Sequence, residues 1–264
     1  MGLPERFRID DQVAVVTGSG QGIGRGIAVG LAEAGADVVV TARRQADLDE
    51  TAARVRAAGR RAVTVAGDLR SDGMADRLAA AAVEQLGRLD IWVNNVGGSD
   101  DKTTHLLVDT PEAVWQSQLE LNLTTAFRGL KAAAAHLSRG GTIINITSGA
   151  GTRGSPRTGP YAAAKAALIN LTQTAALELA PRVRVNAVSP GQVPTEAFRE
   201  VLGVDDDRLV ELAEATPLRR LGTPEDIAGA VLWLVSPAGS WVTGEHVIVG
   251  GGRTQRGGST QRYG

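Results

Sequence analysis

Short runs of β-branched and other apolar residues alternate along this chain with longer, alanine-rich segments, and this alternation limits the folds open to it. Seven runs have the length and composition of strands: Val13–Thr17, Asp37–Thr41, Ala62–Ala66, Asp90–Asn94, Thr142–Thr147, Val183–Val188 and Glu245–Val249. Six segments of helical length lie between them: Ile23–Ala34, Ala46–Ala58, Gly73–Leu86, Pro111–Leu137, Pro160–Leu179 and Pro224–Leu234. Nearly continuous apolar strands are typical of parallel sheets covered on both faces. We therefore predict an α/β fold: a doubly wound, seven-stranded parallel sheet with helices on both faces.

The 264-residue chain shows no linker, repeat or break in composition, which predicts one domain over residues 1–264. A long insertion, residues 192–222, precedes the last helix and contains a short helical piece near Asp205–Ala215. Its run of three Asp, from Asp205, is typical of a solvated helix N-terminus rather than a binding site. The tail, Arg253–Gly264, is polar and glycine-rich, and is either disordered or docked on a neighbouring subunit.

Two helix starts carry a capping signal. Thr110 precedes Pro111 and Thr223 precedes Pro224. Proline is favoured at the first helical position, and a threonine before it can accept hydrogen bonds from the first free N–H groups. We predict that both threonines are N-caps.

Composition excludes several classes of protein. The chain is 43% apolar and 22% charged, which is ordinary for a globular protein and argues against disorder or fibres. It has no Cys and only three scattered His, so we expect no disulfide, thiolate nucleophile or metal site. A formal net charge of −1 offers little attraction for nucleic acid or an anionic membrane. No stretch reaches the roughly 18 apolar residues of a membrane span, and the N-terminus lacks a secretory pattern, so we expect a cytoplasmic protein.

A glycine-rich run, Thr17–Gly24, stands directly between the first predicted strand and the first predicted helix. Glycine lets the backbone turn with positive φ and lets a phosphate approach, and a helix N-terminus offers free N–H groups. Such a run can also be an ordinary tight turn, but its place in a βαβ unit is that of the dinucleotide-binding loop of a Rossmann fold. The predicted contacts to the dinucleotide are Gly18, Ser19, Gly20, Gln21, Gly22, Ile23 and Gly24.

The end of the second predicted strand indicates which dinucleotide is bound. NAD-binding chains place an acidic residue there for the ribose, whereas a nearby Arg suits the 2′-phosphate of NADP. This chain has Ala42 followed by Arg43 and Arg44, which could grip that phosphate together. Alternatively, the two Arg simply solvate the next helix beside Asp47 and Asp49. We favour NADP(H) over NAD(H).

Two further strand ends add to the same edge of the sheet. Asp68 and Leu69 follow the third strand, where the carboxylate could accept a hydrogen bond from an adenine amino group. Asn95, Val96 and Gly97 follow the fourth strand. Asp, Asn and Gly also favour ordinary turns, but ligands of open α/β sheets bind at the carboxyl ends of the strands. We include all five residues among the predicted cofactor contacts.

The residues predicted to carry the chemistry lie near the fifth strand. Ser148 closes that strand, and Tyr161 and Lys165 stand four residues apart on one face of the next helix. An ammonium held beside a tyrosine favours the phenolate and lowers the tyrosine pKa, so that it can exchange a proton with a ketone or an alcohol. Ser148 could orient the same substrate oxygen. Alone, the Tyr/Lys pair could be an exposed amphipathic pair at a helix start.

Taken together, these motifs resemble the short-chain dehydrogenase/reductase family from about Gln12 to Gly252. Thr17–Gly24 is similar to the family's TGxxxGIG loop, and Asn94–Gly97 to its NNAG segment, with Val96 in place of Ala. The remaining matches are Asn122 in LNLTTAF, the Ser148 and YxxxK residues, and the stretch Pro190-Gly191 with Val193 and Thr195.

The resemblance implies a role for each catalytic position. Tyr161 is the expected general acid/base, and Lys165 is expected to hold the nicotinamide ribose and lower the Tyr161 pKa. Ser148 is expected to position the carbonyl group, and Asn122 to hold a water that relays protons from Lys165. Pro190, Gly191, Val193 and Thr195 are expected beside the nicotinamide. Asn122 could instead bond only a neighbouring backbone group.

The substrate is less constrained. In this family the segment after Pro190-Gly191 covers the substrate, and here it carries apolar residues suited to a medium-sized pocket: Phe198, Val201, Leu202, Val204, Leu209 and Leu212. Gly149–Gly151 is expected to leave open space beside Ser148. The layout is similar to that of 3-oxoacyl-carrier-protein reductases, while the C-terminal third also resembles hydroxysteroid dehydrogenases and other secondary-alcohol dehydrogenases.

Two wider expectations complete the interpretation. The long alanine-rich helices carry more small apolar surface than one sheet face needs, and related proteins pair such helices across subunits, so we predict a homo-oligomer, most simply a homotetramer. A chain that only senses NADP(H) is the alternative to an enzyme, because a fold does not settle function. A sensor would not need Asn122, Ser148, Tyr161 and Lys165 together.

Overall fold

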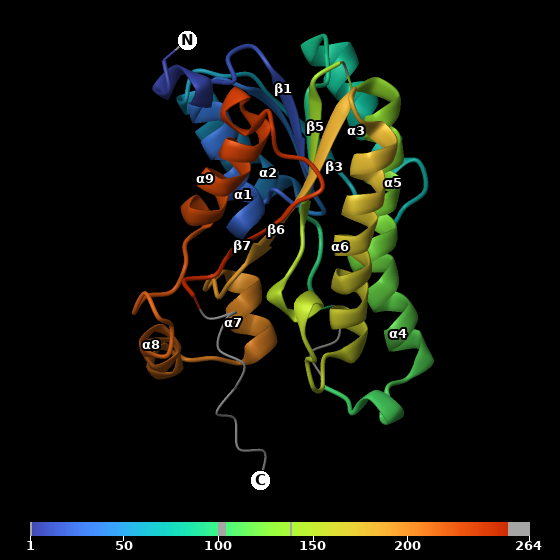
Figure 1. Cartoon of the computed structure of the whole chain (residues 1–264), viewed down its shortest axis with the longest axis vertical. Helices are drawn as coiled ribbons and strands as arrows, with labels where there is room; N and C mark the ends of the chain where they lie inside the picture. The colour runs from blue at the N-terminus through green and yellow to red at the C-terminus, as the bar shows by residue number, and fades with distance from the viewer. Residues whose placement is uncertain (1, 100–103, 138, 253–264) are drawn as a thin grey trace.

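Seven parallel strands form one sheet in the order β3-β2-β1-β4-β5-β6-β7 (Figure 1), which confirms the predicted fold class. The computed structural model describes residues 2–99, 104–137 and 139–252. The strands are β1 (Val13–Val16), β2 (Asp37–Ala42), β3 (Ala62–Ala66), β4 (Ile91–Asn94), β5 (Gly141–Ile146), β6 (Val183–Pro190) and β7 (His246–Val249). The strand order reverses between β1 and β4, and open α/β sheets bind their ligands at such a point.

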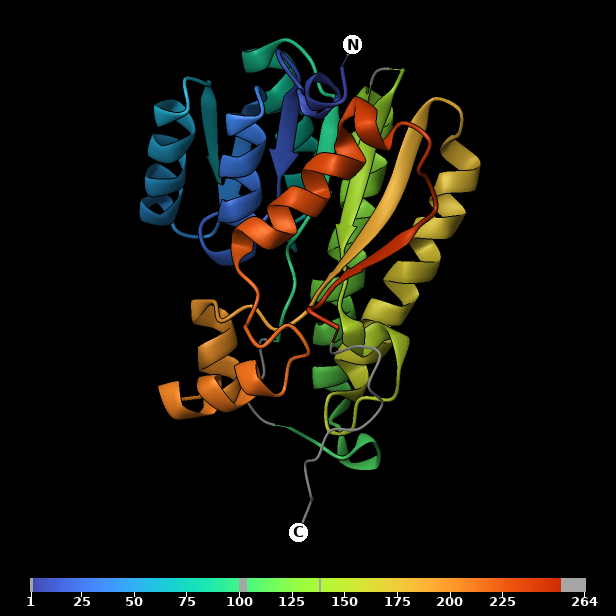
Figure 2. The same ribbon diagram turned by 60° about the vertical axis from the view of Figure 1, so that its left-hand side comes forward.

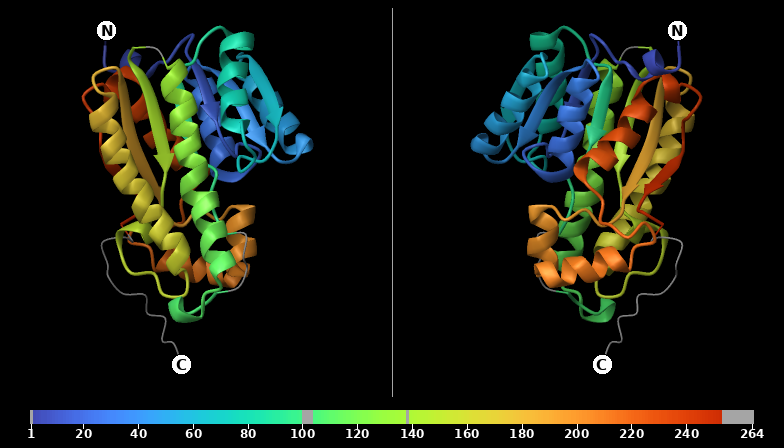
Figure 3. Two further views of the ribbon diagram at one scale, coloured as in Figure 1. Left: turned by 90° about the vertical axis from the view of Figure 1, so that its right-hand side faces the viewer. Right: turned by 90° about the vertical axis from the view of Figure 1, so that its left-hand side faces the viewer.

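Helices cover both faces of the sheet (Figures 1 and 3). The α-helices are α1 (Gly22–Glu33), α2 (Gln45–Ala57), α3 (Met74–Ala81), α4 (Glu112–Leu119), α5 (Thr125–His136), α6 (Gly159–Leu179), α7 (Glu196–Leu202), α8 (Asp206–Glu214) and α9 (Pro224–Val235). Apolar side chains of α1, α2 and α9 pack with one face of the sheet, and those of α3, α5 and α6 with the other. None of the described helices is long and apolar enough to cross a bilayer.

Short 3-10 and π-helical turns lie between these elements. They are η1 (Pro4–Phe7), η2 (Ala82–Leu86), η3 (Leu107–Asp109), η4 (Glu120–Thr124), η5 (Gly149–Thr152) and η6 (Pro237–Gly239). The predicted helix over Pro111–Leu137 is therefore interrupted, because the π-turn η4 separates α4 from α5. α7 was not predicted, because its seven residues are too few to show a periodic pattern.

The two predicted N-caps have different outcomes. Thr223 caps α9 as predicted: its Oγ1 accepts a hydrogen bond from Asp226 N at 3.3 Å, and Asp226 Oδ2 accepts one from Thr223 N at 2.8 Å. The prediction for Thr110 is wrong. Its hydroxyl donates to Leu106 O at 3.1 Å, and no side chain of the described residues caps α4, which begins one residue after Pro111.

Glycines bring α1 and α9 into close contact. A Cβ on Gly26 would lie 2.4 Å from Pro224 Cβ, and a Cβ on Gly30 would lie 3.0 Å from Ala228 Cβ. Larger side chains at either position would push the two helices apart. The contact fixes the position of α1 relative to α9.

The segment from Gln192 to Gly222 leaves the sheet and returns to the same point, since Gly222 N donates to Gln192 O at 2.9 Å. It contains α7 and α8, which lie beyond the carboxyl ends of the strands (Figure 2). Asp205 caps α8 by accepting from Arg208 N at 2.9 Å, which confirms the predicted helix start. The tail, Arg253–Gly264, lies outside the described residues.

Candidate active site

The loop between β1 and α1 forms a backbone cradle. Gly18 and Gly22 have φ of +63° and +53°, the left-handed region that favours glycine. A Cβ on Gly24 would lie 2.3 Å from the Gly18 carbonyl oxygen, so Gly24 is required for the close approach of α1. Gln21 is the N-cap residue of α1, but no side chain of the described residues forms a capping hydrogen bond there. The first turn of α1 carries no acidic residue. The free N–H groups at this helix start fit a phosphate.

Ser19 points away from this cradle, in contrast to its predicted role. Its N–H donates to Thr41 O at 2.9 Å, and its hydroxyl donates to Val16 O at 2.8 Å and accepts from Thr41 N at 3.0 Å. Ser19 is fully buried, and these bonds tie the loop to β2. The Ile23 side chain is partly buried and packs against the apolar core. Their predicted contacts could only be made through the backbone, and for Ser19 the N–H is already used.

The arginines after β2 differ from each other. Arg44 forms an ion pair with Asp47 at 2.7 Å, which raises the Arg44 pKa and matches the alternative interpretation for this residue. Arg43 is exposed and forms no ion pair with any residue that the structure describes. A Cβ on Gly20 would lie 2.8 Å from Ala42 Cβ, so the glycine loop reaches the end of β2. Of the two arginines that follow β2, Arg43 is thus the one without an ion pair to a described residue.

Asp68 and Leu69 take part in other contacts. Arg70 holds the Asp68 carboxylate at 2.7 Å and lowers its pKa, and the Arg43 charge adds to that effect. The carboxylate therefore remains ionised, but its main partner is Arg70. The Leu69 side chain lies in the apolar core, so only its backbone is left for a cofactor contact.

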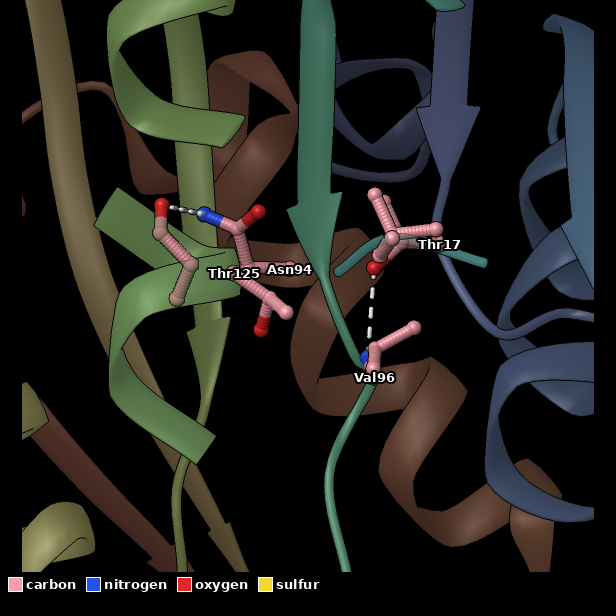
Figure 4. Close-up of a pocket in the computed structure, with 6 residues that line it drawn as sticks. Thr17, Asn94, Val96 and Thr125 are labelled. Atoms are coloured by element: carbon pink, nitrogen blue, oxygen red, sulfur yellow. Dashed lines mark hydrogen bonds between the residues drawn. The ribbon is translucent and has the colours of Figure 1, made fainter. Parts of the chain in front are cut away.

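Thr17 joins β1 to β4, a role that the sequence did not indicate. Its Oγ1 accepts a hydrogen bond from Asn95 N at 2.9 Å. It accepts a second one from Val96 N at 3.2 Å (Figure 4). Asn95 Nδ2 in return donates to Thr17 O at 2.9 Å and Gly18 O at 3.1 Å. The predicted residue Asn95 thereby braces the glycine loop. A small pocket at this junction is lined by Thr17, Leu69, Asn94, Val96, Thr125 and Ala126.

Ser148, Tyr161 and Lys165 come together beyond the carboxyl end of β5. Tyr161 lies in the first turn of α6, near enough to Ser148 for the serine hydroxyl to act on the Tyr161 pKa. The Lys165 Nζ lies 5.8 Å from the centre of the Tyr161 ring and donates to Ile146 O at 3.0 Å. Tyr161 is half-buried and Lys165 is only 3% exposed. An exposed amphipathic pair is therefore excluded.

The pKa values of this group differ from the sequence-based expectation. Burial raises the pKa of Tyr161, and the Ser148 hydrogen bond only partly opposes that rise. Burial lowers the pKa of Lys165 to about 8. The net direction of the Tyr161 pKa is thus opposite to the expected lowering, because burial of the phenol outweighs the interactions that favour its charged form.

Asn122 lies in the π-turn η4 and is buried. Its Oδ1 accepts from Gly98 N at 2.9 Å, and its Nδ2 donates to Gly98 O at 2.9 Å. A Cβ on Gly97 would lie 2.7 Å from Lys165 Nζ and 2.9 Å from Asn122 Oδ1. A larger residue at position 97 would therefore displace the lysine or the asparagine side chain. π-turns inside helices are frequent at functional sites.

The predicted nicotinamide loop continues from β6. β6 ends at Pro190, and Gly191 N donates to Val249 O at 2.8 Å. A Cβ on Gly191 would lie 2.5 Å from the Cα of Gly250, so glycine is required there. The loop is thereby fixed against the end of β7.

Val193 and Thr195 follow in this loop with different surroundings. The Val193 side chain is buried in the apolar core. Thr195 Oγ1 accepts from Phe198 N at 3.2 Å and so caps α7. The Thr195 methyl group would lie 2.9 Å from a Cβ on Gly22. Thr195 is thus in contact with the glycine loop, where a cofactor phosphate is expected.

The apolar side chains of the segment Gln192–Gly222, which is expected to cover the substrate, differ in how far they are buried. Leu209 and Leu212 are buried and Phe198 and Val204 are half-buried, while the side chains of Val201 and Leu202 lie outside what the structure describes. The expectation of open space at Gly149–Gly151 is wrong at Gly151. A Cβ there would lie 2.7 Å from the Lys165 carbonyl carbon, so this glycine serves the packing of η5 on α6.

The chain is similar to known proteins over nearly its whole length. The sequence profile of a family described as enoyl-(acyl carrier protein) reductase matches residues 18–254. An uncharacterized oxidoreductase of Mycobacterium tuberculosis (strain CDC 1551 / Oshkosh) is 46% identical over 254 residues, 95% of each chain. The dehydrogenase/reductase SDR family member 4 of Homo sapiens is 38% identical over 261 residues, 97% of this chain and 92% of that protein.

A solved structure shows the same likeness in three dimensions. It is a 7α-hydroxysteroid dehydrogenase complexed with NADH and 7-oxo glycochenodeoxycholic acid, with a TM-score of 0.87 and 34% identity. The superposition covers 96% of this chain and 98% of that one.

Proposed function

Because the chain belongs to the short-chain dehydrogenase/reductase family and is an oxidoreductase acting on CH–OH groups, we propose that it interconverts a ketone and a secondary alcohol with NADP(H). The observation that supports this proposal best is the grouping of Ser148, Tyr161 and Lys165 at the carboxyl end of β5. A protein that only senses a dinucleotide would have no use for a buried lysine beside a serine and a tyrosine hydroxyl.

Each of these residues has a task in the proposed reaction. When bound, the nicotinamide dinucleotide supplies or accepts the hydride. Tyr161 gives its hydroxyl proton to the ketone oxygen during reduction, and its raised pKa keeps that proton in place beforehand. Ser148 donates to the same oxygen and orients it. In the alcohol-oxidising direction Tyr161 takes the proton back.

Lys165 and Asn122 support Tyr161. The Lys165 ammonium lies under the Tyr161 ring and favours negative charge as the proton leaves. Asn122 is within reach of Lys165 across Gly97, so protons can pass from this pair through water to solvent. Lys165 is also proposed to hold the nicotinamide ribose.

NADP(H) is the proposed cofactor because of the charges at the end of β2. Ala42 has no carboxylate to repel a 2′-phosphate, and Arg43 is free to bind one. Gly18, Gly20, Gly22 and Gly24 shape the phosphate cradle, and Gln21 precedes the free N–H groups of α1. NAD(H) is the second candidate, since the similar 7α-hydroxysteroid dehydrogenase was solved with NADH.

The proposed substrate is a medium-sized apolar ketone or its alcohol. A 3-oxoacyl thioester is one class, which the acyl-carrier-protein description of the matching family favours. A hydroxysteroid is the other, which the similarity to 7α-hydroxysteroid dehydrogenase favours. In both classes the segment Gln192–Gly222 is proposed to cover the apolar part.

The experiment that tests the proposal follows nicotinamide absorbance with NADPH and compares an acetoacetyl thioester with a 7-oxo steroid. Oxidation of NADPH with either ketone supports the proposed reaction and selects the class. Tyr161→Phe is the matched variant: it should bind NADPH about as well as the wild type and lose most turnover, since only the proton donor is removed. Turnover unchanged in Tyr161→Phe would contradict the role of Tyr161.

A further inference from the structure

Gln118 is a buried polar residue that belongs to none of the family motifs. It lies in α4, four residues before Asn122, and is only 3% exposed. Its Nε2 donates to Ser99 Oγ at 3.0 Å. Its Oε1 accepts from Asn122 Nδ2 at 3.1 Å. The Gln118 side chain thus links Ser99, in the loop that follows β4, to the buried Asn122.

These contacts bear on the orientation of the Asn122 amide. Asn122 Nδ2 faces three acceptors: Gly98 O at 2.9 Å, Gln118 O at 3.1 Å and Gln118 Oε1 at 3.1 Å. Asn122 Oδ1 faces the N–H of Gly98. A flipped amide would set its oxygen against three acceptors and its NH₂ group against a donor, so the observed orientation is the favoured one.

The orientation decides which Asn122 atom faces Lys165. Asn122 Oδ1 and Lys165 Nζ border the same position over Gly97, as the distances from a Cβ there show. The partial negative charge of Oδ1 stabilises the ammonium form of Lys165. An NH₂ group in its place would destabilise it.

We propose that Gln118 is a positioning residue, which holds the Asn122 amide with its oxygen toward Lys165 and ties that amide to Ser99. The inference rests on the proposed function, because it concerns the lysine that supports Tyr161. It assigns to Gln118 no contact with substrate or cofactor.

The test compares variants of Gln118 with the same change at Gln116, an exposed residue on the same helix. Gln118→Met keeps the length and removes both hydrogen bonds. We expect the kcat of ketone reduction to fall about tenfold, as for one lost hydrogen bond, with the dissociation constant for NADPH unchanged. Gln116→Met should behave as the wild type.

The pH profile separates positioning from a loss of packing. Gln118→Met removes one of the three acceptors of Asn122 Nδ2, so the amide keeps its oxygen toward Lys165 for less of the time. Lys165 then loses its charge at lower pH, and the alkaline limb of kcat should move to lower pH in Gln118→Met. Gln118→Glu keeps an acceptor for Asn122 Nδ2 and adds negative charge, so its alkaline limb should stay in place or move to higher pH. A shift to lower pH in both variants, or an unchanged limb and kcat in Gln118→Met, would overturn the proposal.

A second readout does not depend on turnover. The side-chain amide signals of Asn122, assigned by their loss in Asn122→Asp, should shift and exchange faster with solvent in Gln118→Met and not in Gln116→Met. If the wild type reduced no ketone, the proposed function would fail, while these signals would still decide the role of Gln118. Signals identical in Gln118→Met and the wild type would overturn it.

Discussion

At the scale of single residues, Arg43 is the one on which the proposed choice of NADP(H) over NAD(H) depends. Arg44 is already paired with Asp47, whereas Arg43 has no such partner among the described residues. A 2′-phosphate would gain a charge-assisted hydrogen bond from Arg43 that a 2′-hydroxyl would not.

We predict that Arg43→Ala weakens NADPH binding roughly 10- to 100-fold and NADH binding by no more than about twofold. Titration of protein fluorescence with each cofactor measures both constants. Arg44→Ala is the matched control and should have a smaller effect on NADPH, because its ion pair with Asp47 leaves it less available. Equal losses for NADPH and NADH in Arg43→Ala would remove the reason for choosing NADP(H).

Single residues also show what sequence could and could not predict about the site. Ser148, Tyr161 and Lys165 were predicted and do lie together, because helical spacing and the strand order fix them. The direction of the Tyr161 pKa was predicted wrongly, because it depends on burial, which the spacing of residues does not show. Thr17 and Gln118 were missed, since their importance comes from partners far along the chain.

At the scale of elements, a row of polar side chains crosses β5, β6 and β7. His246 Nε2 lies 2.6 Å from Ser189 Oγ, and Ser189 Oγ lies 2.8 Å from Thr147 Oγ1. Thr147 precedes Ser148, and Ser189 precedes Pro190. The row therefore joins the edge strand to the two strands that carry the candidate site.

We predict that His246 makes the protein less stable as the pH falls. Burial lowers the pKa of His246, so on acidification the unfolded chain binds this proton before the folded one does. Stability is thus retained at neutral pH and lost as the pH falls through the usual histidine range, about pH 6.5.

The measurement is the midpoint of thermal unfolding between about pH 7.5 and pH 5.5, which brackets that range. His246→Gln should lose less stability over this interval than the wild type. His136→Gln, at an exposed histidine on α5, should lose as much as the wild type. The same pH dependence in all three proteins would count against His246 as the source.

Most elements were predictable because each strand and each long helix has its own apolar pattern. Six predicted helices and seven predicted strands correspond to observed elements. The observed ends differ from the predicted ends by one or two residues, or by a terminal turn. The π-turn η4 was not predictable, because the insertion of one residue in a helix changes hydrogen bonds and not the apolar spacing. Thr110 looked like a cap but bonds backward to Leu106.

At the scale of the whole molecule, large apolar side chains remain exposed on two faces. Leu177 on α6 is 83% exposed, and Trp241, just before the edge strand β7, is 98% exposed. Exposed apolar side chains of this size, beside an unpaired strand edge, are typical of surfaces that pack against another chain.

We therefore predict a homotetramer that uses both faces. Light scattering should give about four times the chain mass of 27.4 kDa. Leu177→Asp should reduce the assembly to dimers, because a buried charge opposes association through α6. Glu178→Asp, on the same helix, is the control and should leave the mass unchanged. A monomeric mass for the wild type would contradict the prediction.

The segment from Gln192 to Gly222 also matters for how such proteins diverge. Its two ends are joined by one backbone hydrogen bond, and it touches the glycine loop mainly where Thr195 meets Gly22. A piece of chain that starts and finishes at the same place can be replaced by inheritance or by design without moving the strands that carry the reactive side chains. New specificities could therefore arise by exchange of this one piece, while the catalytic residues pass unchanged from ancestor to descendant.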